Sequence, residues 1–124
     1  MNLLLDTHVL LWWLSDNPRL SKKGRKSIED ADTVWVSAVT GWEIETKRAR
    51  GLLEAPGDLE EALRFNDFRP LPLRFGHAVA AGQLPAIHRD PFDRMLVAQA
   101  KLEGLVLVTV DKEIAKYGVA VIAG

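Results

Sequence analysis

The amino-acid sequence predicts an α/β domain in which helices cover both faces of a parallel β-sheet. Short apolar runs alternate along the chain with segments of helical periodicity, an arrangement typical of βαβ units. The run Leu105–Val110 has Thr109 as its only polar residue, as expected for a strand buried on both faces. Residues that favour helix N-termini, Asp6 and Ser37, directly follow two other apolar runs.

The composition indicates one globular domain over residues 1–124. Of the 124 residues, 48% are hydrophobic, which is enough to build a core in a chain of this length. The formal net charge of −1 argues against a generally basic surface, so any contact with nucleic acid must be local. The chain has no cysteine, which excludes disulfides and thiolate metal ligands and suits a cytoplasmic protein. No apolar run approaches the roughly 20 residues that span a bilayer, so we expect no membrane segment.

The N-terminal part of the chain predicts one strand and two helices. Asn2–Leu5 is apolar and ends in polar residues, which indicates a buried strand. His8–Leu14 predicts an apolar helix that Asp6 can cap. Ser21 then begins a charged helix that extends to about Asp30.

The second strand is predicted at Thr33–Val36, which is rich in β-branched and aromatic residues. Ser37 can cap a helix from Ala38 to about Arg50, and Gly51 ends it. We expect the four tryptophans of the chain at core positions. The buried side of this helix is predicted to consist of Ala38, Val39, Trp42, Thr46 and Ala49.

Three elements are predicted in the middle of the chain. Asp58–Asn66 has the pattern of a short amphipathic helix. Phe68–Leu73 contains two prolines and therefore predicts an edge strand. Phe75–Leu84 predicts another helix, which its two glycines weaken.

The next helix has the clearest boundaries in the sequence. Asp90 is suited to the N-cap, Pro91 to the first helical position and Gly104 to the position after the helix. Arg94 falls on the side that we expect to face solvent. Asp93 falls among apolar neighbours, where a carboxylate is costly unless a partner compensates it.

The C-terminal part predicts two strands joined by a short helix. Leu105–Val110 is predicted to be a central strand, and Lys112–Tyr117 a helix that Asp111 can cap. Val119–Ile122 is predicted to be the last strand.

Four carboxylates fall where the carboxyl ends of the strands are expected to meet. Asp6 and Asp111 follow strands, and Glu43 and Asp93 lie in early turns of helices. In such sheets ligands bind at this edge. We expect no matching basic residue beside the acids, so their repulsion would raise their pKa values. A hard divalent cation, Mg²⁺ or Mn²⁺, would relieve the conflict and supply phosphoryl-transfer chemistry.

Each acid also has a purely structural explanation. Asp6 and Asp111 can cap helices, and Asp93 can stabilise the first turn of its helix. Glu43 can form an ordinary surface pair with Lys47, four residues further along its helix.

Four segments resemble, in order, the motifs of PIN-domain ribonucleases: Leu5–His8, Val36–Ile44, Asp90–Ala100 and Leu107–Asp111. The resemblance covers essentially the whole chain and is closest to VapC-type toxins of prokaryotic type II toxin–antitoxin pairs. It implies a three-layer α/β/α sandwich with a central parallel sheet. It also implies an endoribonuclease, dependent on Mg²⁺ or Mn²⁺, in which an activated water leaves a 5′-phosphate and a 3′-hydroxyl.

The resemblance also assigns roles to residues. The catalytic and metal-binding acids that it implies are Asp6, Glu43, Asp93 and Asp111. The accessory residues are Asp90, Thr7, Ser37 and Thr109. It further implies an RNA substrate, a homodimer, and an antitoxin that inhibits the enzyme. We expect a basic segment of the antitoxin to bind in the acidic pocket, because arginine pairs well with carboxylates.

The basic residues nearest in sequence to the acids are predicted to contact RNA; they are Lys47, Arg50 and Arg94. The three histidines, His8, His77 and His88, are interpreted as structural or substrate-contacting, since a carboxylate–metal site needs no histidine base.

Two alternatives to a nuclease remain. A PIN-like scaffold that acts only as a binding partner is one, although intact acids argue against it. A phosphoacceptor receiver domain is the other, but Asp6 has no acidic neighbour and the last strand ends without a lysine.

Overall fold

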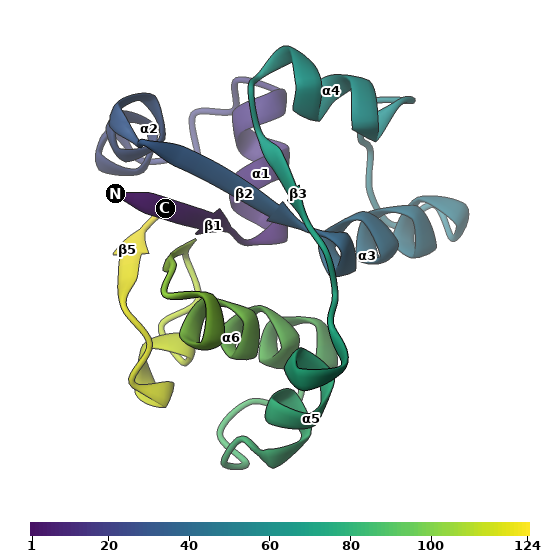
Figure 1. The fold of residues 1–124 in the computed structure, drawn as a ribbon. Helices are drawn as coiled ribbons and strands as arrows, with labels where there is room; N and C mark the ends of the chain where they lie inside the picture. The colour runs from purple at the N-terminus through teal and green to yellow at the C-terminus, as the bar shows by residue number, and fades with distance from the viewer.

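Five parallel strands form the central sheet of the computed structural model, which describes residues 1–124 (Figure 1). The strands are β1 (Asn2–Leu5), β2 (Thr33–Ser37), β3 (Arg69–Leu71), β4 (Val106–Thr109) and β5 (Val121–Ala123). Their order across the sheet is β3-β2-β1-β4-β5, and every neighbouring pair is parallel. The N-terminal strand is therefore the central one, β4 is an interior strand, and the proline-containing β3 lies at an edge, as predicted.

Six α-helices and one 3₁₀ helix cover the sheet. They are α1 (Thr7–Leu14), α2 (Lys22–Asp30), α3 (Ala38–Ala49), α4 (Leu59–Phe65), α5 (Phe75–Gln83), α6 (Pro91–Glu103) and the 3₁₀ helix η1 (Ile114–Tyr117). Alternate side chains of β1 point to opposite faces of the sheet. Leu3 and Leu5 pack in one apolar cluster with residues of α1, α2 and α4, and Leu4 packs in a second with residues of α6 and η1. The predicted three-layer α/β/α arrangement is confirmed, with α5 and α6 on the opposite side of the sheet from α2 and α4 (Figure 1).

The predicted helix boundaries have the expected local causes. The side chain of Asp6 accepts a hydrogen bond from the Val9 N–H at the start of α1, and Asp90 accepts from the Phe92 N–H at the start of α6. Gly104 ends α6 with φ = 66°, a left-handed conformation that glycine adopts without steric cost.

Two elements near the C-terminus differ from the prediction. The expected helix Lys112–Tyr117 is a 3₁₀ helix that begins only at Ile114. The Asp111 carboxylate accepts from the Glu113 N–H instead, and thereby forms a tight turn before the helix. The last strand is Val121–Ala123, where its backbone lies in register with β4.

The predicted buried side of α3 is wrong in four of five positions. Only Val39 of the predicted set is buried. Trp42 is 65% exposed, and its ring meets the Phe92 ring of α6 in an edge-to-face arrangement. The buried side of α3 instead consists of Val39, Thr40, Glu43 and Ile44. The helix is thus rotated so that a carboxylate, and not an indole, faces the interior.

None of the helices combines the length and the apolar character that a bilayer-spanning segment would need.

Candidate metal centre

Polar side chains gather at the carboxyl edge of the sheet, beginning with Asp6 after β1. One Asp6 carboxylate oxygen caps α1 at 2.8 Å from the Val9 nitrogen, and the other accepts a hydrogen bond from the Thr109 hydroxyl at the end of β4. Burial raises the pKa of Asp6, although these hydrogen bonds oppose the rise. This carboxylate therefore joins the ends of the neighbouring strands β1 and β4.

Glu43 of α3 is buried beside α1, the helix that Asp6 caps. It is only 5% exposed, one of its oxygens accepts a hydrogen bond from the Thr7 hydroxyl, and the other lies 2.6 Å from the Lys47 ammonium. This hydrogen bond raises the pKa of Lys47. The explanation of Glu43 and Lys47 as an ordinary solvated surface pair is therefore wrong, because the carboxylate faces the interior.

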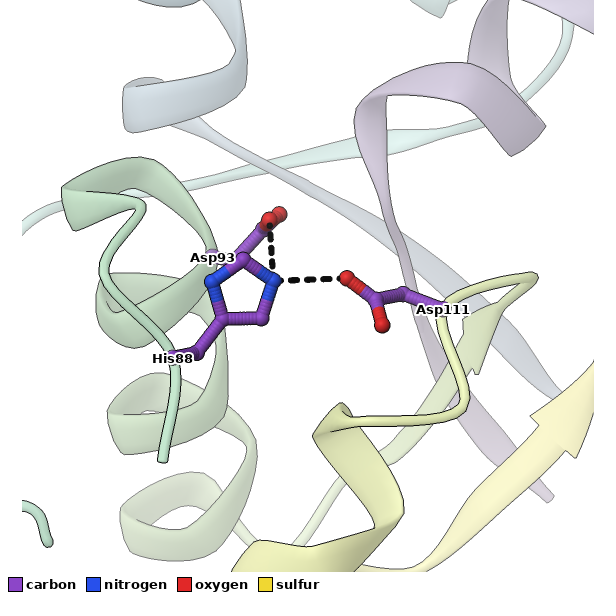
Figure 2. Close-up of side chains that lie close together, drawn as sticks. All are labelled: His88, Asp93 and Asp111. Carbon is purple, nitrogen blue, oxygen red and sulfur yellow. Dashed lines mark hydrogen bonds and ion pairs between the residues drawn. The ribbon is translucent and has the colours of Figure 1, made fainter. Parts of the chain in front are cut away.

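Asp93 and Asp111 are bridged by a histidine (Figure 2). His88 Nε2 lies 2.7 Å from Asp111 Oδ2 and 3.3 Å from Asp93 Oδ2. The Asp90 N–H donates to His88 Nδ1 at 3.1 Å. The ring proton of neutral His88 is therefore on Nε2 and points at the two carboxylates.

Burial and neighbouring carboxylates move the pKa of Asp93 far from its ordinary value. Burial, followed by the charge of Asp90, raises the pKa of Asp93 to about 7; Asp6 and Glu43 add to the rise, and His88 opposes it. Burial alone would lower the pKa of His88, but its hydrogen bond to Asp111 and the surrounding carboxylates raise it overall. Asp93 is thus a carboxyl group with more negative neighbours than positive ones.

The structure places the predicted site residues in two groups. Asp93 and Asp111 each have an oxygen that lies, with His88 Nε2, in one group of atoms within 4.8 Å of one another. Asp6 and Glu43 lie outside that trio but close enough to act on the pKa of Asp93.

The accessory residues hold this edge together. Asp90 caps α6, Thr7 binds Glu43, and Thr109 binds Asp6. Ser37 caps α3 through the Val39 N–H and donates to Gln99 of α6.

The expectation that the acids have no basic neighbour is wrong, because Lys47 and His88 both contact them. Sequence reasoning left His88 out of the site. Its position two residues before the Asp90 cap was the only signal available, and its contact with Asp111 joins residues 23 positions apart.

Arg94 is only partly exposed, and its guanidinium is held by backbone carbonyl oxygens. Its guanidinium donates to the carbonyl oxygens of Ala81 at 2.8 Å, Pro85 at 2.9 Å and Leu84 at 3.0 Å. It also reaches the His88 carbonyl at 3.4 Å. These contacts hold the segment between α5 and α6, which carries His88, against the first turn of α6.

Arg94→Ala is therefore expected to loosen this segment. Because hydrogen bonds to charged groups contribute about 1.5–3 kcal/mol each and the freed carbonyls can reach water, we expect a loss of roughly 1–3 kcal/mol in the free energy of unfolding. Amide hydrogen exchange should accelerate over residues 84–90. Arg89→Ala is the matched control, since Arg89 is exposed in the same segment and should change stability by less than about 0.5 kcal/mol. Unchanged exchange in Arg94→Ala would contradict this role.

The other two predicted RNA contacts differ from each other. The Lys47 side chain is about one third exposed and pairs with Glu43, whereas Arg50 is exposed at the C-cap of α3.

The donor atoms fit a hard divalent cation. Asp93 and Asp111 bring carboxylate oxygens to one place, with Asp6 and Glu43 nearby, and oxygen donors are what Mg²⁺ and Mn²⁺ prefer. The partly buried Asp93 carboxyl group, which has several acidic neighbours, supports the same interpretation, because a cation among these acids would stabilise its ionised form.

Comparisons with known proteins agree with this fold. The model of the PIN domain family matches residues 3–120. The chain is 30% identical over 119 residues to Ribonuclease VapC22 from Mycobacterium tuberculosis, covering 92% of this chain and 90% of that protein.

Two solved structures have a similar fold. FitAcB from Neisseria gonorrhoeae matches with a TM-score of 0.70 and 24% identity over 99% of this chain and 97% of that one. A toxin–antitoxin complex from Klebsiella pneumoniae matches with a TM-score of 0.70 and 18% identity over 98% and 96%. From the family match and the identity to VapC22, the chain belongs to the PIN domain family.

Proposed function

We propose that this chain, acting as one domain over residues 1–124, is an endoribonuclease toxin of the VapC kind that hydrolyses RNA with a divalent metal ion. The observation that carries the proposal is the meeting of Asp93 and Asp111 oxygens with His88 Nε2 in one group of atoms within 4.8 Å of one another, with Asp90, Asp6 and Glu43 close enough to raise the pKa of Asp93. A fold has no need of such crowding, whereas a cation site does. The similarity to Ribonuclease VapC22 supports RNA as the substrate class.

In this proposal Asp6, Glu43, Asp93 and Asp111 hold Mg²⁺ or Mn²⁺. The ion, when bound, supplies Lewis-acid activation of the scissile phosphodiester and of a water molecule. The chain's own residues prepare the site: Thr109 orients Asp6 and Thr7 orients Glu43 through their hydroxyl groups. Asp90 binds the first N–H groups of α6 and so fixes the turn that carries Asp93.

Lys47 and Arg50 are the basic residues that we propose as contacts for the RNA backbone. Substituting both by alanine should weaken RNA binding and flatten its dependence on salt, since each phosphate contact releases counterions.

Three further properties belong to the proposal. A basic segment of an antitoxin would enter the acidic edge and inhibit the enzyme; the similar fold from Klebsiella pneumoniae belongs to a toxin–antitoxin complex. We also propose that the chain forms a homodimer. We further propose that the protein acts in the cytoplasm, because its proposed substrate is RNA.

The test is to map cleavage of total RNA by the purified protein with Mg²⁺, with Mn²⁺ and with excess EDTA. We expect cleavage with either metal and none in EDTA, because carboxylates without a cation cannot activate the water. Robust cleavage in EDTA would reject the metal mechanism. Absence of cleavage under every condition would favour a non-catalytic binding partner.

A further inference from the structure

Two aromatic side chains, each next in sequence to an acid of the candidate site, contact each other between α3 and α6 and have no role in the proposed chemistry. Trp42 precedes Glu43 on α3, and Phe92 precedes Asp93 on α6. Their ring centroids are 5.2 Å apart, and the rings meet edge to face at 64°. Trp42 is nevertheless 65% exposed, so most of the indole contacts no other residue of the chain.

The surroundings of this pair connect it to the acidic edge. The Lys47 ammonium lies 6.0 Å from the centre of the Phe92 ring and 2.6 Å from the Glu43 carboxylate. The Lys47 ammonium therefore lies near both the aromatic pair and the Glu43 carboxylate. Aromatic faces combined with a nearby cation are the features by which proteins bind single-stranded nucleic acid, since every base can stack and every linkage carries a negative charge.

We propose that Trp42 and Phe92 form a stacking platform for one unpaired nucleobase next to the phosphodiester that the acidic edge would cleave. The inference rests on the proposed nuclease function and extends it to the form of the substrate. A paired base has both faces covered by its neighbours in the helix, so a platform of this kind favours loops and single strands. It places no requirement on base identity, because stacking tolerates every base.

The experiment uses the full-length protein and a synthetic RNA oligonucleotide that spans a mapped cleavage site. The nucleobase is removed at one position at a time, with the sugar–phosphate backbone kept intact, and kcat/KM is measured for each oligonucleotide. With the wild-type protein, we expect removal at one position beside the cleaved bond to lower kcat/KM by about 5- to 150-fold.

The variant Trp42→Ala should show the same loss on the intact oligonucleotide and little further loss when that base is also removed. Such non-additivity is the signature of two groups that act through one contact. Trp42→Tyr should retain most of the activity, because tyrosine also stacks. Phe65→Ala is the matched control, since Phe65 is 90% exposed on α4 and should behave as wild type.

Additive losses would overturn the proposal while leaving the nuclease function intact. So would a change in sedimentation behaviour in Trp42→Ala, which would identify this face as an interface between copies of the chain. Phe92→Leu provides a second test that does not depend on the folding of the first variant, with the same non-additivity expected. Failure of the wild-type protein to cleave RNA with either metal would overturn the platform and the proposed function together.

Discussion

Asp93→Asn is expected to abolish RNA cleavage and, in EDTA at pH 8, to stabilise the fold. Asparagine has nearly the same shape, so the variant removes the charge and one potential metal ligand. Loss of the ligand should lower cleavage by roughly 10²-fold or more, because a bound metal contributes several kcal/mol to the transition state. Mg²⁺ should also raise the melting temperature of the variant less than that of the wild-type protein.

The expected gain in stability follows from the raised pKa of Asp93. At pH 8 the ionised carboxylate is held among other acids, and the neutral amide does not experience their repulsion. We expect a net gain of about 1–3 kcal/mol, which already allows for the roughly 0.3–1 kcal/mol that the lost charge contributes at the start of α6. Asp58→Asn is the control, because Asp58 caps α4 and asparagine caps equally well. An active but destabilised Asp93→Asn would show that Asp93 serves only its helix.

Without metal, the wild-type protein is expected to lose stability as the pH rises towards 7, the reverse of ordinary acid denaturation. The pKa of Asp93 is about 7 in the folded protein against 3.8 for an unperturbed aspartate. Between these values folding takes up a proton, so the free energy of unfolding falls as the pH rises through this window and levels off above it. The raised pKa of Asp6 acts in the same direction. The raised pKa of His88 also acts in this direction. The stability that protonated His88 contributes is lost as the pH rises through the pKa of His88 in the folded protein.

Urea denaturation in EDTA at pH 5 and pH 8 measures this effect. We expect the protein to be about 2 kcal/mol more stable at pH 5, and the difference to shrink in Asp93→Asn. Saturating Mg²⁺ should offset the loss at pH 8, because a cation favours the ionised carboxyl groups. Stability that rises from pH 5 to pH 8 in EDTA would contradict the crowding of these acids.

The parts of the fold that the sequence predicted well are those with local causes. Asp6, Ser37 and Asp90 cap helices through their own side chains, and the apolar runs place the strands within one or two residues. The sequence predicted a parallel sheet but not the order of its strands, which the structure shows to be β3-β2-β1-β4-β5. Because β1 and β4 are parallel neighbours, their carboxyl ends bring Asp6 and Asp111 to one edge.

The errors arise where distant contacts decide the outcome. The rotation of α3 depends on Glu43, which the Thr7 hydroxyl binds from 36 residues away, so hydrophobicity alone wrongly placed Trp42 inside. Arg94 binds backbone carbonyl oxygens, and every residue has one, so its partners have no sequence signature.

The central position of β1 has a consequence for how the molecule is made. Strand β1 is synthesised well before β4, with which it pairs on one side, and the Asp6–Thr109 hydrogen bond spans 103 residues. Contacts of such high sequence separation form late in folding. Nascent chains that end before β4 lack Asp111 and leave one side of β1, with its three leucines, unpaired, an edge prone to aggregation. Asp111 can join the other acids only after β4 has been made, so a chain that ends before β4 has no assembled acidic edge.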